Sequence, residues 1–251
     1  FQEIQPRLII HLAAETDVDH CEKYPDHAFR IAIVGAQNVA RLAVKYNAEV
    51  LYVSTTGVFD GRKAGLYTEF DDALPVTVYG KAKLEAENIV RELCPKSYIL
   101  RAGWVFGGGC ERDKKFVGKM IQMMTERPEV SVVDDKKGSP TYALDFMQNA
   151  AIVAASGYYG LYHLVNHGAA TRYEIALELR KILGLSTKVL PVTSAMFPMP
   201  AFRPPNDSVR NYRLQLLGLD KMRSWQDALA DYVSDWTLAT RESTLATAQA
   251  T

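Results

Sequence analysis

Tyr79 and Lys83 lie four residues apart in a stretch whose apolar residues recur at helical spacing. Residues four apart share one face of a helix, so we expect the phenol and the ammonium to be neighbours. A nearby ammonium lowers the pKa of a phenol, which would let Tyr79 give or take a proton near neutral pH. The same spacing is also typical of a half-buried tyrosine beside a solvated lysine. The pair predicts proton-transfer chemistry only if further groups join it.

Thr55 is the third candidate for chemistry. It follows an apolar, β-rich run at 50–53 and belongs to the polar turn 54–57. Open α/β sheets bind ligands just beyond the carboxyl ends of their parallel strands. We therefore expect the Thr55 hydroxyl to hold a substrate oxygen while Tyr79 moves the proton.

The elements that must position these residues alternate between strand and helix. Apolar runs typical of strands buried on both faces are separated by amphipathic helical patterns. The expected strands are 7–12, 50–53 and 98–101, and the expected helices are 26–46 and 79–93. Short connections between them imply parallel strands with right-handed crossovers. The first half therefore predicts an α/β fold with a doubly wound, Rossmann-type parallel sheet.

The second half has shorter elements, typical of a smaller α/β lobe. Its expected helices are 114–125, 144–155, 172–183 and 225–236, and its expected strands are 130–133, 161–165 and 188–192. We predict that residues 1–135 are the remainder of a cofactor-binding domain. Residues 136–240 would form mainly a substrate-binding lobe, with segments that return to the first domain, and 241–251 a polar tail.

Composition excludes several classes of function. The 29 Lys and Arg residues balance 29 Asp and Glu residues, so a nucleic-acid partner is not expected. The chain has no apolar run long enough to cross a membrane. Three cysteines without a CxxC spacing predict reduced thiols in a cytoplasmic protein. His20 and His27 lie at a polar helix entry and are expected to be solvated, and no metal site is predicted.

Seven segments, in order along the chain, carry a resemblance to a known family. They are 12–19 (LAAETDVD), 54–61 (STTGVFDG), 78–84 (VYGKAKL), 100–106 (LRAGWVF), 138–141 (GSPT), 160–164 (GLYHL) and 203–204 (RP). On these segments the chain resembles the extended short-chain dehydrogenase/reductase superfamily. Within that superfamily it is most similar to the dTDP-4-dehydrorhamnose reductase family, from about Pro6 to Trp236.

The resemblance implies a role for individual residues. The implied catalytic residues are Thr55, Tyr79 and Lys83, with Tyr79 protonating the sugar C4 oxygen as hydride arrives from NADP or NAD. The implied cofactor-binding residues are Ala13, Ala14, Thr16, Ser54, Tyr79 and Lys83. The implied substrate-binding residues are Thr55, Trp104, Thr141 and Arg203, and the guanidinium suits a diphosphate. A nucleotide-sugar substrate and, by analogy, a homodimer are also implied.

Three positions depart from the family pattern. Thr56 and Gly57 stand where these reductases usually have an Asp-Tyr pair that helps hold the sugar, which leaves the identity of the sugar open. The missing acid also argues against 4,6-dehydratase chemistry. Ala32 stands where relatives often carry an asparagine that supports the active site, so an altered proton relay is expected.

Two other functions fit the same motifs. One is a non-catalytic, NADP-binding regulatory subunit that resembles the β subunit of methionine adenosyltransferase. The other is a nucleotide-sugar 4-epimerase. Turnover of a 4-keto sugar distinguishes the reductase from the regulatory subunit, and tightly held NAD would favour the epimerase.

The glycine-rich turn of a dinucleotide-binding fold is not found in these residues. Such a fold begins with a strand and a turn of the type GxGxxG, whose following helix binds the pyrophosphate. Neither GxGxxG nor GxxGxxG occurs in the 251 residues. We expect this strand and turn in roughly 50 residues upstream of Phe1. The alternative is a family member that has lost this part of the cofactor site.

Overall fold

A four-stranded parallel sheet organises the computed structural model, which describes residues 1–236. Its strands are β1 (Leu8–His11), β2 (Glu49–Thr55), β3 (Ser97–Ala102) and β8 (Gly160–His163), in the order β1-β2-β3-β8. Within the sheet, β3 is buried along its whole length, as its continuous apolar run predicts. The parallel α/β fold predicted from the sequence is confirmed.

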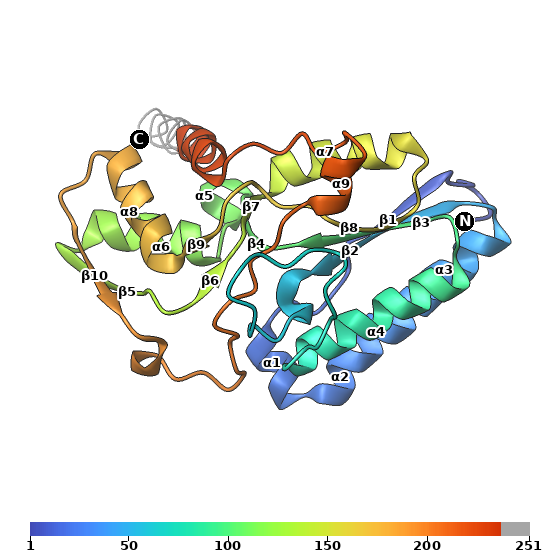
Figure 1. Cartoon of the computed structure of the whole chain (residues 1–251), viewed down its shortest axis with the longest axis horizontal. Helices are drawn as coiled ribbons and strands as arrows, with labels where there is room; N and C mark the ends of the chain where they lie inside the picture. The colour runs from blue at the N-terminus through green and yellow to red at the C-terminus, as the bar shows by residue number, and fades with distance from the viewer. Residues whose placement is uncertain (237–251) are drawn as a thin grey trace, which may run out of the picture.

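One face of the sheet is covered by the crossover helices. The connection from β1 to β2 contains α1 (Val18–Lys23), α2 (Pro25–Phe29), η1 (Arg30–Val34) and α3 (Gly35–Lys45), and α4 (Val78–Leu93) joins β2 to β3. Figure 1 shows α3 and α4 side by side along this face. They approach closely because the residues between them are small, with Ala36, Ala40 and Ala86 fully buried. The predicted helix 26–46 is therefore present, but η1 interrupts it with a π-helical turn.

The opposite face is covered by α7 (Ala143–Ser156) and α9 (Tyr212–Leu216) (Figure 1). Phe146, Ala150 and Val153 of α7 pack against Tyr98 and Leu100 of β3. Helices thus cover both faces of the parallel sheet, which is the arrangement that a doubly wound fold requires.

A second hydrophobic cluster lies beyond the carboxyl ends of the strands (Figure 1). It contains α6 (Phe116–Glu126), α8 (Arg172–Leu183), the parallel pair β5 (Glu129–Val133) and β10 (Lys188–Val192), and the helix 225–236. α6 and β5 precede residue 136 but pack into this second lobe, whereas α7 and β8 follow it and belong to the sheet lobe. The predicted tail 241–251 lies outside the described residues.

Short elements connect the two lobes. β4 (Trp104–Phe106) pairs in parallel with β7 (Pro140–Tyr142), and β6 (Lys137–Gly138) pairs antiparallel with β9 (Ala170–Thr171). The remaining elements are η2 (Thr56–Val58), α5 (Gly109–Arg112) and η3 (Ser194–Met196). No helix in the described part of the chain is long and apolar enough to cross a membrane.

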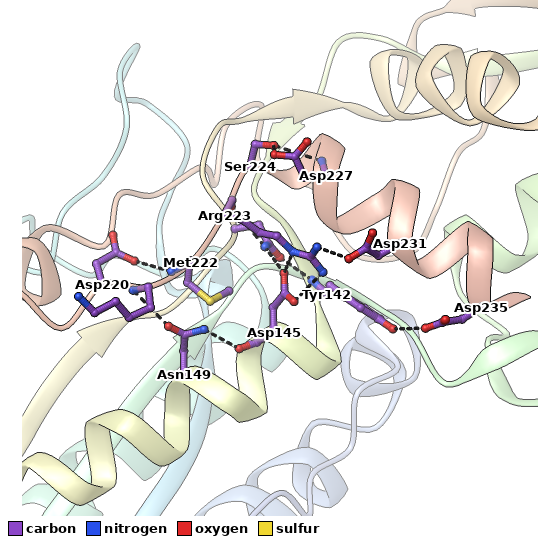
Figure 2. Close-up of polar contacts among 12 residues, drawn as sticks. Tyr142, Asp145, Asn149, Asp220, Met222, Arg223, Ser224, Asp227, Asp231 and Asp235 are labelled. Carbon is purple, nitrogen blue, oxygen red and sulfur yellow. Dashed lines mark hydrogen bonds and ion pairs between the residues drawn. The ribbon is translucent and has the colours of Figure 1, made fainter.

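Arg223 fixes the last helix to the sheet lobe, as Figure 2 shows. Its guanidinium donates to both carboxylate oxygens of Asp145 on α7, at 2.9 Å each, and also to Asp231 on the helix 225–236. This fork-to-carboxylate geometry holds the two groups in one orientation. The second lobe is thereby anchored to α7, and the cleft between the lobes has a defined shape.

Candidate active site

Thr55 is the last residue of β2, at the carboxyl end of the strand. Its extended backbone turns directly into η2, and its Oγ1 accepts a hydrogen bond from the Gly57 amide at 3.0 Å. The phenol of Tyr79 lies beside the Thr55 hydroxyl, and both residues line the same cavity. The strand end therefore presents the predicted pair in contact.

The first turn of α4 brings Tyr79 to this strand end. Thr77 caps the helix, and its Oγ1 accepts the Gly80 amide hydrogen at 3.0 Å. A Cβ atom on Gly80 would lie 2.3 Å from the carbonyl oxygen of Gly57. Only glycine allows the helix and the turn after β2 to approach this closely, so Gly80 sets the position of Tyr79.

Lys83 lies on the same helix but faces the sheet. Its Nζ donates to the carbonyl oxygen of Val53 at 2.7 Å and lies 4.1 Å from the centre of the Tyr52 ring. Burial lowers the pKa of Lys83 to about 8. Burial also raises the pKa of Tyr79, and the hydrogen bond from Thr55 opposes that shift. The predicted lowering of the Tyr79 pKa by Lys83 is therefore wrong for this structure, because the ammonium is directed at the β2 backbone.

A buried ion pair lies beside the carboxyl end of β2. Arg101 of β3 donates to Glu87 of α4 through Nη2 at 2.7 Å and Nε at 2.9 Å, and both side chains are 4% exposed. The Ser54 hydroxyl donates to the same carboxylate. The side chain of Ser54, predicted to bind the cofactor, is thus directed into the protein, and only its backbone remains for such a contact.

Two cavities meet at Tyr79, one of about 310 Å³ and one of about 510 Å³. Both are lined by Tyr79, Gly103, Trp104 and Arg172. Thr55, Arg203 and Asp207 line the smaller cavity only, and Thr16, Arg112 and Lys115 line the larger cavity only. The predicted residues Thr55, Tyr79 and Trp104 therefore come together around one cleft.

Trp104 forms the wall between the two cavities. The guanidinium carbon of Arg172 lies 3.9 Å from the centre of its ring. On the side of Gly138, a Cβ atom would meet the indole at 2.2 Å. The Trp104 indole is therefore held between the Arg172 guanidinium and the backbone of Gly138.

Replacing Gly138 by alanine is expected to displace the Trp104 ring and to lower kcat/KM by about tenfold to hundredfold, if the ring positions bound substrate as the family resemblance implies. Steady-state kinetics would measure this effect. Gly65→Ala is the matched control, since a Cβ there meets nothing within 4 Å. Equal activities of the two variants would contradict a positioning role for Trp104.

Arg203 and Thr141 are placed differently from expectation. Arg203 lines the smaller cavity, but its Nη2 donates to Asp19 at 2.8 Å, so a diphosphate would have to compete with this carboxylate. Thr141 is fully buried, and its hydroxyl donates to the Ser139 carbonyl at 3.2 Å. Thr141 lines neither cavity in this structure, and a substrate contact from its side chain stays a prediction.

Asp207 is a site residue that the sequence did not reveal. Its carboxylate accepts a hydrogen bond from Thr56 at 3.0 Å, and it lines the smaller cavity together with Trp104. Burial raises the pKa of Asp207 to about 6, although Arg172 opposes the shift. The segment around Asp207 reaches the site because its amide pairs with the Lys137 carbonyl, beside Gly138. In the sequence, the one indication of a role for Asp207 was its position just after the matched segment 203–204.

Arg172 was also missed. It is the first residue of α8, and the capping box of Thr171 and Glu174 fixes this helix start. Burial lowers the pKa of Arg172 to about 10, so the side chain stays charged at neutral pH. It supplies the cation that both cavities share.

The remaining predicted residues lie after β1 and on the covering helices. Ala13 and Thr16 are exposed and Ala14 is half-buried, at the carboxyl end of the sheet. Ala32 lies within the π-helical turn and packs in the apolar cluster between the helices and the sheet. Alanine has no polar side-chain group, so position 32 offers nothing to a proton relay, and the expected alteration of that relay stays a prediction.

The RmlD substrate binding domain family matches residues 1–238. The chain is 35% identical to dTDP-4-dehydrorhamnose reductase of Aggregatibacter actinomycetemcomitans, over 90% of this chain and 80% of that protein. It is 34% identical to the spore coat polysaccharide biosynthesis protein SpsK of Bacillus subtilis, over 94% of this chain and 81% of that protein. The crystal structure of dTDP-4-dehydrorhamnose reductase from Bacillus anthracis in complex with NADP superposes with a TM-score of 0.88 at 37% identity, covering 92% of this chain and 82% of that one. The chain belongs to the dTDP-4-dehydrorhamnose reductase family of the extended short-chain dehydrogenase/reductase superfamily.

Proposed function

We propose that the protein reduces the C4 ketone of a nucleotide-linked 4-keto sugar, dTDP-4-dehydrorhamnose, with NADPH or NADH. The observation that carries the proposal is the position of Tyr79, which lies beside Thr55 at the carboxyl end of β2 and lines both cavities. Relatives at about 35% identity are named for this reaction, which favours it over the regulatory subunit and the epimerase.

The proton chemistry follows from the environment of Tyr79. Because burial raises its pKa, the phenol holds its proton at neutral pH and acts as an acid toward a ketone oxygen. The Thr55 hydroxyl, which lies beside the phenol, would align the same oxygen. As the proton leaves, the Thr55 hydroxyl can donate a hydrogen bond to the phenolate.

The residues present fit the nicotinamide half of a dinucleotide. Lys83 is buried and has three N–H donors, of which Val53 accepts one, so donors remain for the ribose hydroxyls. The backbone after β1, at Ala13 and Ala14, is accessible at the carboxyl end of the sheet. The reduced nicotinamide supplies the hydride. We propose that the sheet lobe holds this cofactor.

The second lobe suits the sugar nucleotide. Arg112, Lys115 and Arg172 bring three cationic side chains to the larger cavity, and a diphosphate carries negative charge that they can neutralise. Trp104 offers an aromatic surface between the two cavities, against which a sugar or base can pack. Asp207 and Thr56 supply hydrogen-bonding oxygens where the family usually has an acid.

The test is an assay of the full-length protein with NADPH and dTDP-4-dehydrorhamnose. We expect NADPH oxidation with stoichiometric formation of dTDP-rhamnose. Binding of NADPH without turnover would favour the regulatory subunit instead. Interconversion of 4-epimers without net NADPH consumption would favour the epimerase.

Asp207 is expected to give the reaction a pH dependence. Above its pKa of about 6 the carboxylate is ionised and accepts hydrogen bonds, so kcat/KM should fall as the pH drops below 6. Asp207→Asn should lower kcat/KM about tenfold at pH 7.5, since it removes a hydrogen bond to a charged group. It should also remove the fall in kcat/KM below pH 6. If kcat/KM of the variant falls below pH 6 as it does in the wild type, the titrating group is not Asp207.

The same substitution should have the opposite effect on stability. The folded pKa of Asp207 lies above the ordinary value of 3.8, so the folded state holds the proton more tightly and loses stability as the pH rises from about 4 to 6. Asp207→Asn removes this loss, and its melting temperature should exceed that of the wild type at pH 7.5. Asp72→Asn, at an exposed carboxylate, is the control for the change in net charge.

A further inference from the structure

Three side chains that the proposed reaction does not use converge beside the end of β1. Glu15 follows the strand, His20 lies on α1 and His27 lies on α2. The Oε2 atom of Glu15 is 3.4 Å from His20 Nδ1 and 3.8 Å from His27 Nε2. One ligand atom from each residue lies within 4.8 Å of the other two. The residues offer two imidazole nitrogens and one carboxylate oxygen around a common point.

The separations are too long for hydrogen bonds. An N–H to oxygen hydrogen bond spans about 2.7–3.2 Å. Bonds of about 2.0–2.2 Å from zinc to nitrogen and oxygen give about 3.3–3.5 Å between two ligand atoms of a tetrahedral site. His20 Nδ1 is buried and has no hydrogen-bond partner among the residues that the structure describes. The 3.4 Å between Glu15 Oε2 and His20 Nδ1 fits this range, and the His27 nitrogen at 3.8 Å would move a few tenths of an ångström inward to share the ion.

Neighbouring groups hold the three side chains in place. Oε1 of Glu15 accepts the Asp17 amide hydrogen at 2.9 Å, which leaves Oε2 directed at the imidazoles. Asp17 also caps α1 through the amide of His20 at 2.9 Å. The His20 ring packs against Tyr24 with centroids 4.8 Å apart and meets the His27 ring edge-on at 5.4 Å. Supporting contacts of this kind orient metal ligands in proteins.

We propose that Glu15, His20 and His27 bind a divalent ion of the zinc class, with water completing the coordination. Two imidazoles and one carboxylate suit zinc and its neighbours, whereas magnesium and calcium prefer sites made of oxygen atoms. The side chains of Glu15, His20 and His27 are 25%, 39% and 47% exposed, so the ion can enter from solvent. Since Glu15 lies between Ala14 and Thr16, the ion would tie the segment after β1 to both helices.

The test uses full-length, tag-free protein treated with a chelator and then dialysed. A Cys110→Ser background removes the half-buried free thiol, which would compete for the probe ions. Calorimetry with Zn²⁺ and visible absorption with Co²⁺ should each show one saturable equivalent. Glu15→Gln and His27→Ala should each weaken binding at least tenfold.

His167→Ala is the matched control. It removes an exposed imidazole that pairs with Asp220 at 2.9 Å, outside the cluster, and should leave the ion affinity unchanged. Absence of a saturable equivalent in the parent protein, or equal affinities in the parent and in Glu15→Gln, would overturn the proposal. Because Glu15→Gln keeps the shape of the side chain, this comparison does not depend on how His27→Ala folds. The reductase assay reports separately on the proposed function.

Discussion

Tyr79→Phe is expected to lower kcat for 4-keto-sugar reduction by about 10²–10⁴-fold, because it removes the acid that protonates the ketone oxygen. The phenyl ring keeps the packing of the first turn of α4, so the melting temperature should change little. Stopped assays of dTDP-rhamnose formation would give kcat, and KM for the nucleotide sugar should stay within a few-fold of the wild type.

Tyr158→Phe is the matched control for this loss. It removes the same hydroxyl from a tyrosine that is 56% exposed and lines neither of the two cavities, and it should retain full activity. Tyr79→Phe with at least a tenth of the wild-type kcat would mean that another group delivers the proton.

Arg101→Met is expected to cost about 3–5 kcal/mol of unfolding free energy, because it leaves the Glu87 carboxylate buried without its cation. Glu87 and Arg101 are each 4% exposed, so solvent cannot replace the lost partner. Urea denaturation followed by circular dichroism would measure the change. In a protein of this size, each kcal/mol lowers the melting temperature by about 2–4 °C.

The double variant Glu87→Leu/Arg101→Met tests whether the lost stability comes from the unpaired charge of Glu87. Replacing both ions by apolar groups of similar volume is often neutral for stability, so most of the lost free energy should return. Ser54 then loses its acceptor, and activity should fall even where stability recovers. If the double variant is as unstable as Arg101→Met, the loss comes from side-chain packing rather than from an unpaired charge.

The periodic parts of the fold could be predicted from the sequence because each has a local cause. β3 is buried on both faces, so its apolar run stands out, and α4 has one buried stripe over four turns. The π-helical turn Arg30–Val34 leaves no such signal, because a single widened turn keeps the alanine stripe of the surrounding helix. The packing of α6 and β5 in the second lobe also has no local cause, since it depends on α8 and β10, which follow much later.

The residues of the candidate site also include some that the local sequence predicts and some that it does not. Thr55, Tyr79 and Trp104 are fixed by a strand end, a helix start and a short strand, all readable from nearby residues. Asp207 reaches Thr56 across 151 positions of sequence, and no local pattern encodes that contact. Residue spacing also could not predict where the Lys83 ammonium points. Spacing places a side chain on a helix face but does not choose between Tyr79 and the Val53 carbonyl.

The shared wall of Trp104 and Arg172 has a thermodynamic consequence. A ligand that fills one cavity and fixes this stack also changes the free energy of filling the other, because the same two side chains line both. Linkage then requires the effect to be reciprocal: the factor by which a ligand in one cavity alters the affinity of the other equals the factor in the opposite direction. Ligands that occupy the two cavities are therefore expected to bind cooperatively rather than independently.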